Sequence, residues 1–74
     1  MMDIFQVYQE FKWVNNVLFS SKTEKHIEVS VNLFNNFMNK WRFDITEDLK
    51  ITLNRNFNEN CLSHKKKVLS LSQN

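Results

Sequence analysis

Three side chains in this sequence carry donor atoms that zinc prefers, and two of them are spaced as in half of a zinc site. Cys61 and His64 form a Cys-x-x-His pair, and His26 is the other histidine. A structural zinc site needs about four protein ligands, so these three residues fall short. We therefore expect no metal, and we interpret Cys61 as a buried, reduced structural thiol.

The residue pattern gives catalysis no further support. A cysteine nucleophile needs a neighbouring base and an oxyanion pocket, and nothing in the sequence places either one. Glu47 and Asp48 are adjacent, so their carboxylates diverge on a helix and fit charges of a first helical turn. Phosphate-binding loops need glycine, which the chain lacks. We expect a protein that is not an enzyme and that takes no cofactor and no small-molecule substrate.

A short basic segment, "HKKK" at residues 64 to 67, could bind phosphate by charge without reading base sequence. Residues 61–74 carry three lysines and no acid, whereas residues 1–60 carry seven basic and eight acidic side chains. A protein that reads a nucleic-acid groove is expected to show a basic face across its body. Because residues 1–60 are instead slightly acidic, nucleic-acid binding is the second hypothesis. Its candidate contacts are Lys50, Arg55, Lys65, Lys66 and Lys67.

Large apolar side chains suggest a different surface. The chain holds seven Phe, two Trp and one Tyr among 74 residues. A domain this short buries only a marginal core, and a single cysteine cannot cross-link it internally. Such an apolar surplus is typical of dimer seams and partner-binding faces, so a protein partner is the favoured hypothesis. The candidate partner-binding residues are Trp13, Val17, Phe34, Phe37, Met38 and Trp41.

The elements that must carry these side chains are predicted to be helices. Tight hairpins need residues that accept positive φ at low cost, and the chain has no glycine. A first helix is expected after Asp3 as its cap, over "IFQVYQEFKWVNNVLF". Trp13 and Val17 point away from its apolar stripe, so either a third helix or the tail covers Trp13, or Trp13 anchors a partner. The predicted stripe consists of Ile4, Val7, Tyr8, Phe11, Val14 and Leu18, with Asn15 inside it.

A second helix is predicted over "IEVSVNLFNNFMNKW", residues 27 to 41, after a capping box "SKTE" at Ser21 to Glu24. Its apolar residues cover more than half of the helix circumference. That width predicts a central helix of a bundle or a helix shared with another molecule. Asn15 of the first helix either fixes the register of a helical interface or lies at the wet end of its stripe. The apolar positions of the second helix are Ile27, Val31, Phe34, Met38 and Trp41, with Val29, Leu33 and Phe37 beside them.

A third helix is expected from a cap at Asp44 or Thr46 to about Glu59. Residues 49–53 also alternate as in a strand, but a four-residue apolar ladder from Ile45 to Cys61 favours a helix. Residues 61–74 form a basic C-terminal segment, which is a fourth short helix, a frayed continuation or partly disordered. The predicted fold is therefore an all-α bundle of three to four helices with its core in residues 1–60.

These features predict a small helical module that binds a protein with fixed stoichiometry, with a homodimer as one form of it. No stretch reaches the roughly 18 apolar residues of a membrane span, and no signal peptide opens the chain, so we expect a cytoplasmic location without membrane contact. The absence of Gly, Pro and Ala, whose codons are GC-rich, indicates an AT-rich genome. In length and coding bias, though in no motif, the chain resembles small helical proteins with which phages and mobile elements block host proteins, including defence proteins. That resemblance implies an inhibitor.

Overall fold

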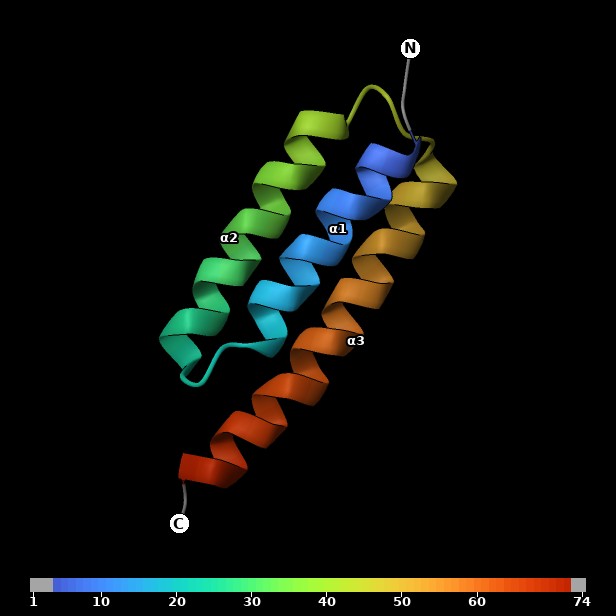
Figure 1. Ribbon diagram of the computed structural model, residues 1–74. Helices are drawn as coiled ribbons and strands as arrows, with labels where there is room; N and C mark the ends of the chain where they lie inside the picture. Colours follow the sequence, from blue (N-terminus) through green and yellow to red (C-terminus); the bar gives the residue numbers. More distant parts are fainter. Residues whose placement is uncertain (1–3, 73–74) are drawn as a thin grey trace.

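The structure, a computed structural model, describes residues 4–72 as three α-helices: α1 (Ile4–Phe19), α2 (Glu24–Trp41) and α3 (Glu47–Ser72). The helices lie side by side, α2 runs antiparallel to both others, and short connections join them at opposite ends (Figure 1). The all-α prediction is confirmed, and residues 49–53 are helical rather than a strand. Within the described range there are three helices, so the fourth is not found.

The start of α2 differs in detail from the prediction. Thr23 is its N-cap, because the Thr23 hydroxyl accepts a hydrogen bond from the backbone N–H of His26 at 3.2 Å. The capping box predicted to begin at Ser21 is therefore wrong. The Ser21 hydroxyl instead donates to the carbonyl of Val17 at 2.9 Å and closes the end of α1.

The start of α3 settles one alternative that the sequence left open. Thr46, not Asp44, is the cap, since its hydroxyl accepts a hydrogen bond from the backbone N–H of Leu49 at 3.2 Å. Two acidic residues follow in the first turn, where they complement the helix dipole. Asp3, the predicted cap of α1, lies outside the described residues.

The length of α3 is the largest departure from the predicted fold. The helix does not end near Glu59 but continues through the basic segment to Ser72, which agrees with the continuation that was one alternative for residues 61–74. Lysine is a good helix former, so the lysine run gives the helix no reason to stop. Val68 is buried in the core, so the fold also uses part of the segment predicted to lie outside it. Gln73 and Asn74 lie outside the described residues.

An aromatic cluster joins the three helices at the centre of the core. Phe34 and Phe57 stack with ring centroids 4.2 Å apart and planes inclined by 3°. Phe11 of α1 lies 6.1 Å from Phe34 and 5.9 Å from Phe37, centroid to centroid. Such ring pairs add to the free energy gained from burial alone. The buried apolar residues are Val7, Val14, Leu18, Ile27, Phe34, Phe37, Trp41, Ile45, Leu53, Phe57 and Val68.

Two residues of the predicted α1 stripe, Ile4 and Tyr8, are exposed. At about 100° per residue they lie roughly 80° and 120° round the helix from Val14. The predicted stripe is therefore too wide, because only its side that holds Val7, Val14 and Leu18 faces the core.

Polar contacts fix how α3 sits against α1. The Asn60 amide donates to the side-chain oxygen of Asn15 at 3.2 Å, and the Asn15 amide donates to the carbonyl of Phe11 at 3.2 Å. Just beyond the C-terminal end of α1, His64 Nε2 donates to the carbonyl of Ser21 at 2.6 Å. Asn15 therefore ties together two helices of the same chain, which agrees with the register interpretation of this residue.

Candidate functional site

Trp13 lies beside the line of contact between α1 and α2 and leaves 55% of its surface exposed. A hollow of about 210 Å³ opens next to it, with Val14 and Phe37 in its floor and Leu33 on its α2 side. Over residues 47–70, α3 does not cover Trp13. The alternative in which the chain's own third helix shelters this side chain is therefore wrong for the described residues.

A second hollow, of about 200 Å³, continues the same line toward the α1–α2 connection and is lined by Val17 of α1 and Val29 of α2. Trp13 and Val17 are four residues apart, as are Val29 and Leu33, so each pair shares one helix face. We call these four residues the α1/α2 seam. They form an apolar strip, half exposed at Trp13 and Val29.

Charged groups beside the seam are paired with one another. Lys40 forms a salt bridge with Glu10, and the indole N–H of Trp41 donates to the other oxygen of the same carboxylate. Burial acts to raise the pKa of Glu10, but the hydrogen bonds from Lys40 and Trp41 outweigh it and hold the pKa below its ordinary value. The Lys40 ammonium also lies 5.1 Å from the centre of the Trp41 ring.

Three of the six predicted partner-binding residues belong to the interior. Phe34, Phe37 and Trp41 are buried in the core, and Met38 is partly buried against it. Most of the wide apolar arc of α2, which suggested a helix shared with another molecule, is instead covered by α1 and α3, whereas Val29 at its margin is exposed. Only Trp13 of the predicted set is largely open to a partner, with Val17 half-buried next to it.

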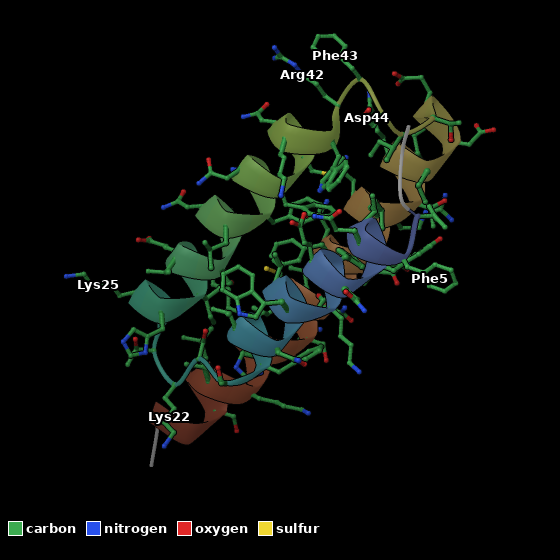
Figure 2. All side chains as sticks on the ribbon, turned by 45° about the horizontal axis from the view of Figure 1, so that its top comes forward. Phe5, Lys22, Lys25, Arg42, Phe43 and Asp44 are labelled. Atoms are coloured by element: carbon green, nitrogen blue, oxygen red, sulfur yellow. The ribbon has the colours of Figure 1, made fainter. Side chains whose placement is uncertain are left out.

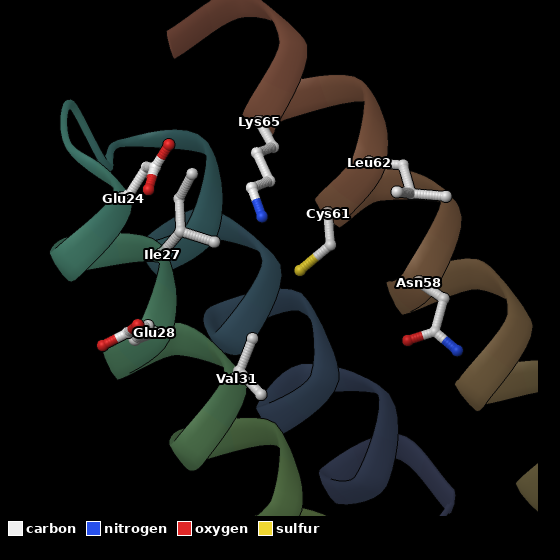
Figure 3. Close-up of a pocket in the computed structure, with 8 residues that line it drawn as sticks. All are labelled: Glu24, Ile27, Glu28, Val31, Asn58, Cys61, Leu62 and Lys65. Atoms are coloured by element: carbon white, nitrogen blue, oxygen red, sulfur yellow. The ribbon is translucent and has the colours of Figure 1, made fainter. Parts of the chain in front are cut away.

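A groove of about 500 Å³ lies between α2 and α3 (Figure 3). Ile27 and Val31 form its α2 wall, Cys61 points into it from α3, and Leu62 stands at its edge with 64% of its surface exposed. The remaining lining residues are polar or charged: Glu24, Glu28, Asn58 and Lys65. This groove was not predicted from the sequence, because its residues come from two distant segments, each with an unremarkable pattern.

The thiol of Cys61, which was expected to be buried, is only partly buried and faces the groove. Burial raises its pKa, and the nearby Lys65 ammonium offsets this only in part. A raised pKa keeps the thiol protonated at neutral pH, which is the opposite of what an activated cysteine nucleophile requires. Across residues 4–72, no three His, Cys, Asp or Glu side chains come together as a metal site would need.

The basic residues named as nucleic-acid contacts do not form one face. Lys65, Lys66 and Lys67 are consecutive, so at about 100° per residue they point in three directions around α3. Lys50 forms an ion pair with Glu47 at 3.0 Å and, like Arg55, lies in the first half of the helix.

Two other lysines join the tail lysines at one end of the bundle. The contact between His64 and the Ser21 carbonyl holds α3 against the α1–α2 connection, which carries Lys22, while Lys25 follows in the first turn of α2 (Figure 2). Lys22 and Lys25 could not be grouped with the tail lysines from the sequence, because about 40 residues separate them from the tail.

The comparisons add no relative to this picture. Over the described residues, no helix combines the length and the apolar character that crossing a bilayer would take. No family model, curated protein or solved structure matches the chain.

Proposed function

We propose that this protein is a small helical module that binds another protein with fixed stoichiometry through the α1/α2 seam. The observation that supports this most is the contrast between its two tryptophans. Trp41 is buried and its indole N–H is hydrogen bonded to Glu10, whereas Trp13 is 55% exposed and its indole has no such partner within residues 4–72. An exposed tryptophan beside a hollow is a typical anchor of a binding surface.

The chemistry of the seam indicates the kind of surface that fits it. Trp13, Val17, Val29 and Leu33 offer apolar contact, and the nearest acid and base already neutralise each other. A partner therefore needs to bring no charge to this strip. The apolar face of a helix, lying along the line between α1 and α2, suits it, and a carbonyl or carboxylate of the partner can accept a hydrogen bond from the Trp13 indole.

Coverage of a partner's surface in this manner is how a stoichiometric inhibitor acts. The hypothesis that the protein blocks a host protein on behalf of a phage or mobile element is compatible with this mechanism. It rests on length and coding bias alone and stays a hypothesis.

The proposal is tested by placing a photo-crosslinking amino acid at position 13 and, in a separate sample, at position 43. Phe43 is 86% exposed and lies at the end of the bundle away from the α1–α2 connection, so it is the matched control (Figure 2). We expect a discrete adduct in the native host from position 13 and none from position 43.

The trapped partner is then purified and titrated calorimetrically against the wild type, Trp13→Ser and Phe43→Ser. Loss of an anchor tryptophan typically costs about 2 kcal/mol or more, so Trp13→Ser should weaken binding by at least about thirtyfold, and Phe43→Ser should not. Equal affinity of the wild type and Trp13→Ser, or the same adducts from both positions, would refute the proposal.

Nucleic-acid binding remains the second candidate because the fold adds Lys22 and Lys25 to the end that carries the tail lysines. Such a surface would bind phosphates by charge and without sequence preference. A salt titration against random duplex DNA separates the two functions. Submicromolar affinity that falls steeply with salt, and is lost in a variant with Lys22 and Lys25 changed to Gln, would favour this candidate over the seam.

A further inference from the structure

The groove between α2 and α3 has the features that a surface needs in order to bind a copy of itself. In a twofold dimer the same patch serves both partners, which sets two conditions. First, the patch must contain both a projecting side chain and the hollow that receives it. Second, it must carry charges of both signs. Ile27, Val31 and Cys61 line the hollow, and Leu62 projects beside it from α3 (Figure 3). The groove therefore meets the first condition within one stretch of surface.

The charged residues of the groove meet the second condition. Glu24 and Glu28 belong to its α2 side and Lys65 belongs to its α3 side. Within residues 4–72 none of the three takes part in a salt bridge. This differs from the α1/α2 seam, where Glu10 and Lys40 satisfy each other.

We propose that a second copy of this chain occupies the α2/α3 groove, forming a twofold dimer in which α3 of each copy packs antiparallel to α3 of the other. With the axis near Leu62, each Leu62 enters the apolar hollow of the opposite copy, and each Lys65 lies opposite Glu28 of the opposite copy. Dimerisation removes from water a leucine that is 64% exposed in the single chain. It also pairs charges that have no salt-bridge partner within the described part of one chain.

This inference deepens the protein-binding function by naming one partner, but it uses a different surface from the seam. In the dimer both Trp13 side chains stay open to a foreign protein. Failure of the groove proposal therefore leaves the seam proposal standing, and the reverse also holds. Trp13→Ser changes the seam and should leave the dissociation constant of the dimer unchanged.

The first test is sedimentation equilibrium of the wild type, Leu62→Lys and Phe43→Lys from 1 µM to 1 mM. Both changed side chains are exposed, so both variants should fold, which circular dichroism checks. We expect a reversible dimer for the wild type and Phe43→Lys, and a dissociation constant at least tenfold higher for Leu62→Lys. A wild type that stays monomeric over the whole range would overturn the proposal, as would equal dimerisation by Leu62→Lys.

The second test exploits the twofold symmetry. The Lys65→Glu variant places an acid opposite Glu28, and the Glu28→Lys variant places a base opposite Lys65, so each variant alone should dimerise more weakly than the wild type. In an equimolar mixture both charge pairs are opposite in sign, so a heterodimer should form with affinity within a few-fold of the wild type.

A control pair, Lys12→Glu and Asp44→Lys, carries the same charge changes at exposed positions outside the groove. It should show neither the individual weakening nor the recovery on mixing. Recovery by the control pair as well would mean that net charge, not the groove, governs association, and the proposal would fall. No recovery by the Lys65 and Glu28 pair would overturn the assigned geometry.

Discussion

Replacing Trp41 by phenylalanine tests the division between buried and exposed tryptophan on which the proposed function depends. The substitution keeps an aromatic ring in the core but removes the indole N–H that donates to the Glu10 carboxylate. Lys40 then remains as the one side chain that pairs with that carboxylate among the described residues. Trp13→Phe is the matched control, because the same chemical change there removes no hydrogen bond within the described fold.

The expected cost follows from the contacts of Trp41. A hydrogen bond to a charged group contributes about 1.5 to 3 kcal/mol, and the lower half of this range applies because the Glu10 side chain keeps 29% of its surface in contact with water. The smaller ring leaves a gap in a site only 9% exposed, which adds up to about 1 kcal/mol. We expect Trp41→Phe to lower the free energy of unfolding by about 2 to 3 kcal/mol, and Trp13→Phe by less than about 0.5 kcal/mol.

Urea unfolding followed by circular dichroism measures both values, and thermal unfolding gives a second reading. For a domain of this size 1 kcal/mol corresponds to roughly 4 to 8 °C, so the melting temperature of Trp41→Phe should fall by about 10 to 20 °C. Equal effects of the two substitutions would refute this reasoning, because the two tryptophans would then occupy equivalent environments. A neutral Trp41→Phe would show that the Glu10 hydrogen bond does not stabilise the fold.

Three further predictions concern titration, capping and the thiol. The folded-state pKa of Glu10 is depressed, so ionised Glu10 stabilises the fold at pH values above its ordinary pKa of 4.5, and this stabilisation is lost as the pH falls through the lower folded pKa. Glu10→Gln should therefore flatten the decline of melting temperature in that pH range. An unchanged decline would contradict the assignment. Thr23→Ala removes the cap of α2 and should cost about 1 kcal/mol by urea unfolding, whereas Ser20→Ala, which lies in the same connection, should cost less. Because burial raises its pKa, Cys61 should react with a disulfide reagent more slowly than free cysteine at pH 7.5. In denaturant it should react at the ordinary rate. A rate above that of free cysteine in the folded protein would contradict the raised pKa.

The fold followed from the sequence where local patterns carried the information. The four-residue ladder from Ile45 to Cys61 outweighed the strand-like alternation of residues 49–53, and the structure has a helix there. The end of α3 was missed because no glycine or proline marks a helix end anywhere in the chain, and the lysine run is itself compatible with a helix.

The candidate surface was harder to predict, because exposure depends on which helix covers which face. The apolar stripe of α2 identified Phe34 and Trp41 correctly as one face, but it could not show that α1 and α3 cover that face. Trp13 stood out because it breaks the pattern of its own helix, which is a local signal. Lys22, next to the Ser21 carbonyl that binds His64, joins the tail lysines only through the tertiary fold.

Acrylamide quenching of tryptophan fluorescence tests the central claim, that the isolated chain leaves apolar surface uncovered at the seam. Trp41→Phe leaves Trp13 as the single tryptophan, and Trp13→Phe leaves Trp41. At low micromolar concentration, Trp13 should be quenched several times faster than Trp41, and addition of the cognate partner should protect it. Equal protection of both tryptophans in the isolated chain would contradict the account, because the fold would then shelter its own apolar surface.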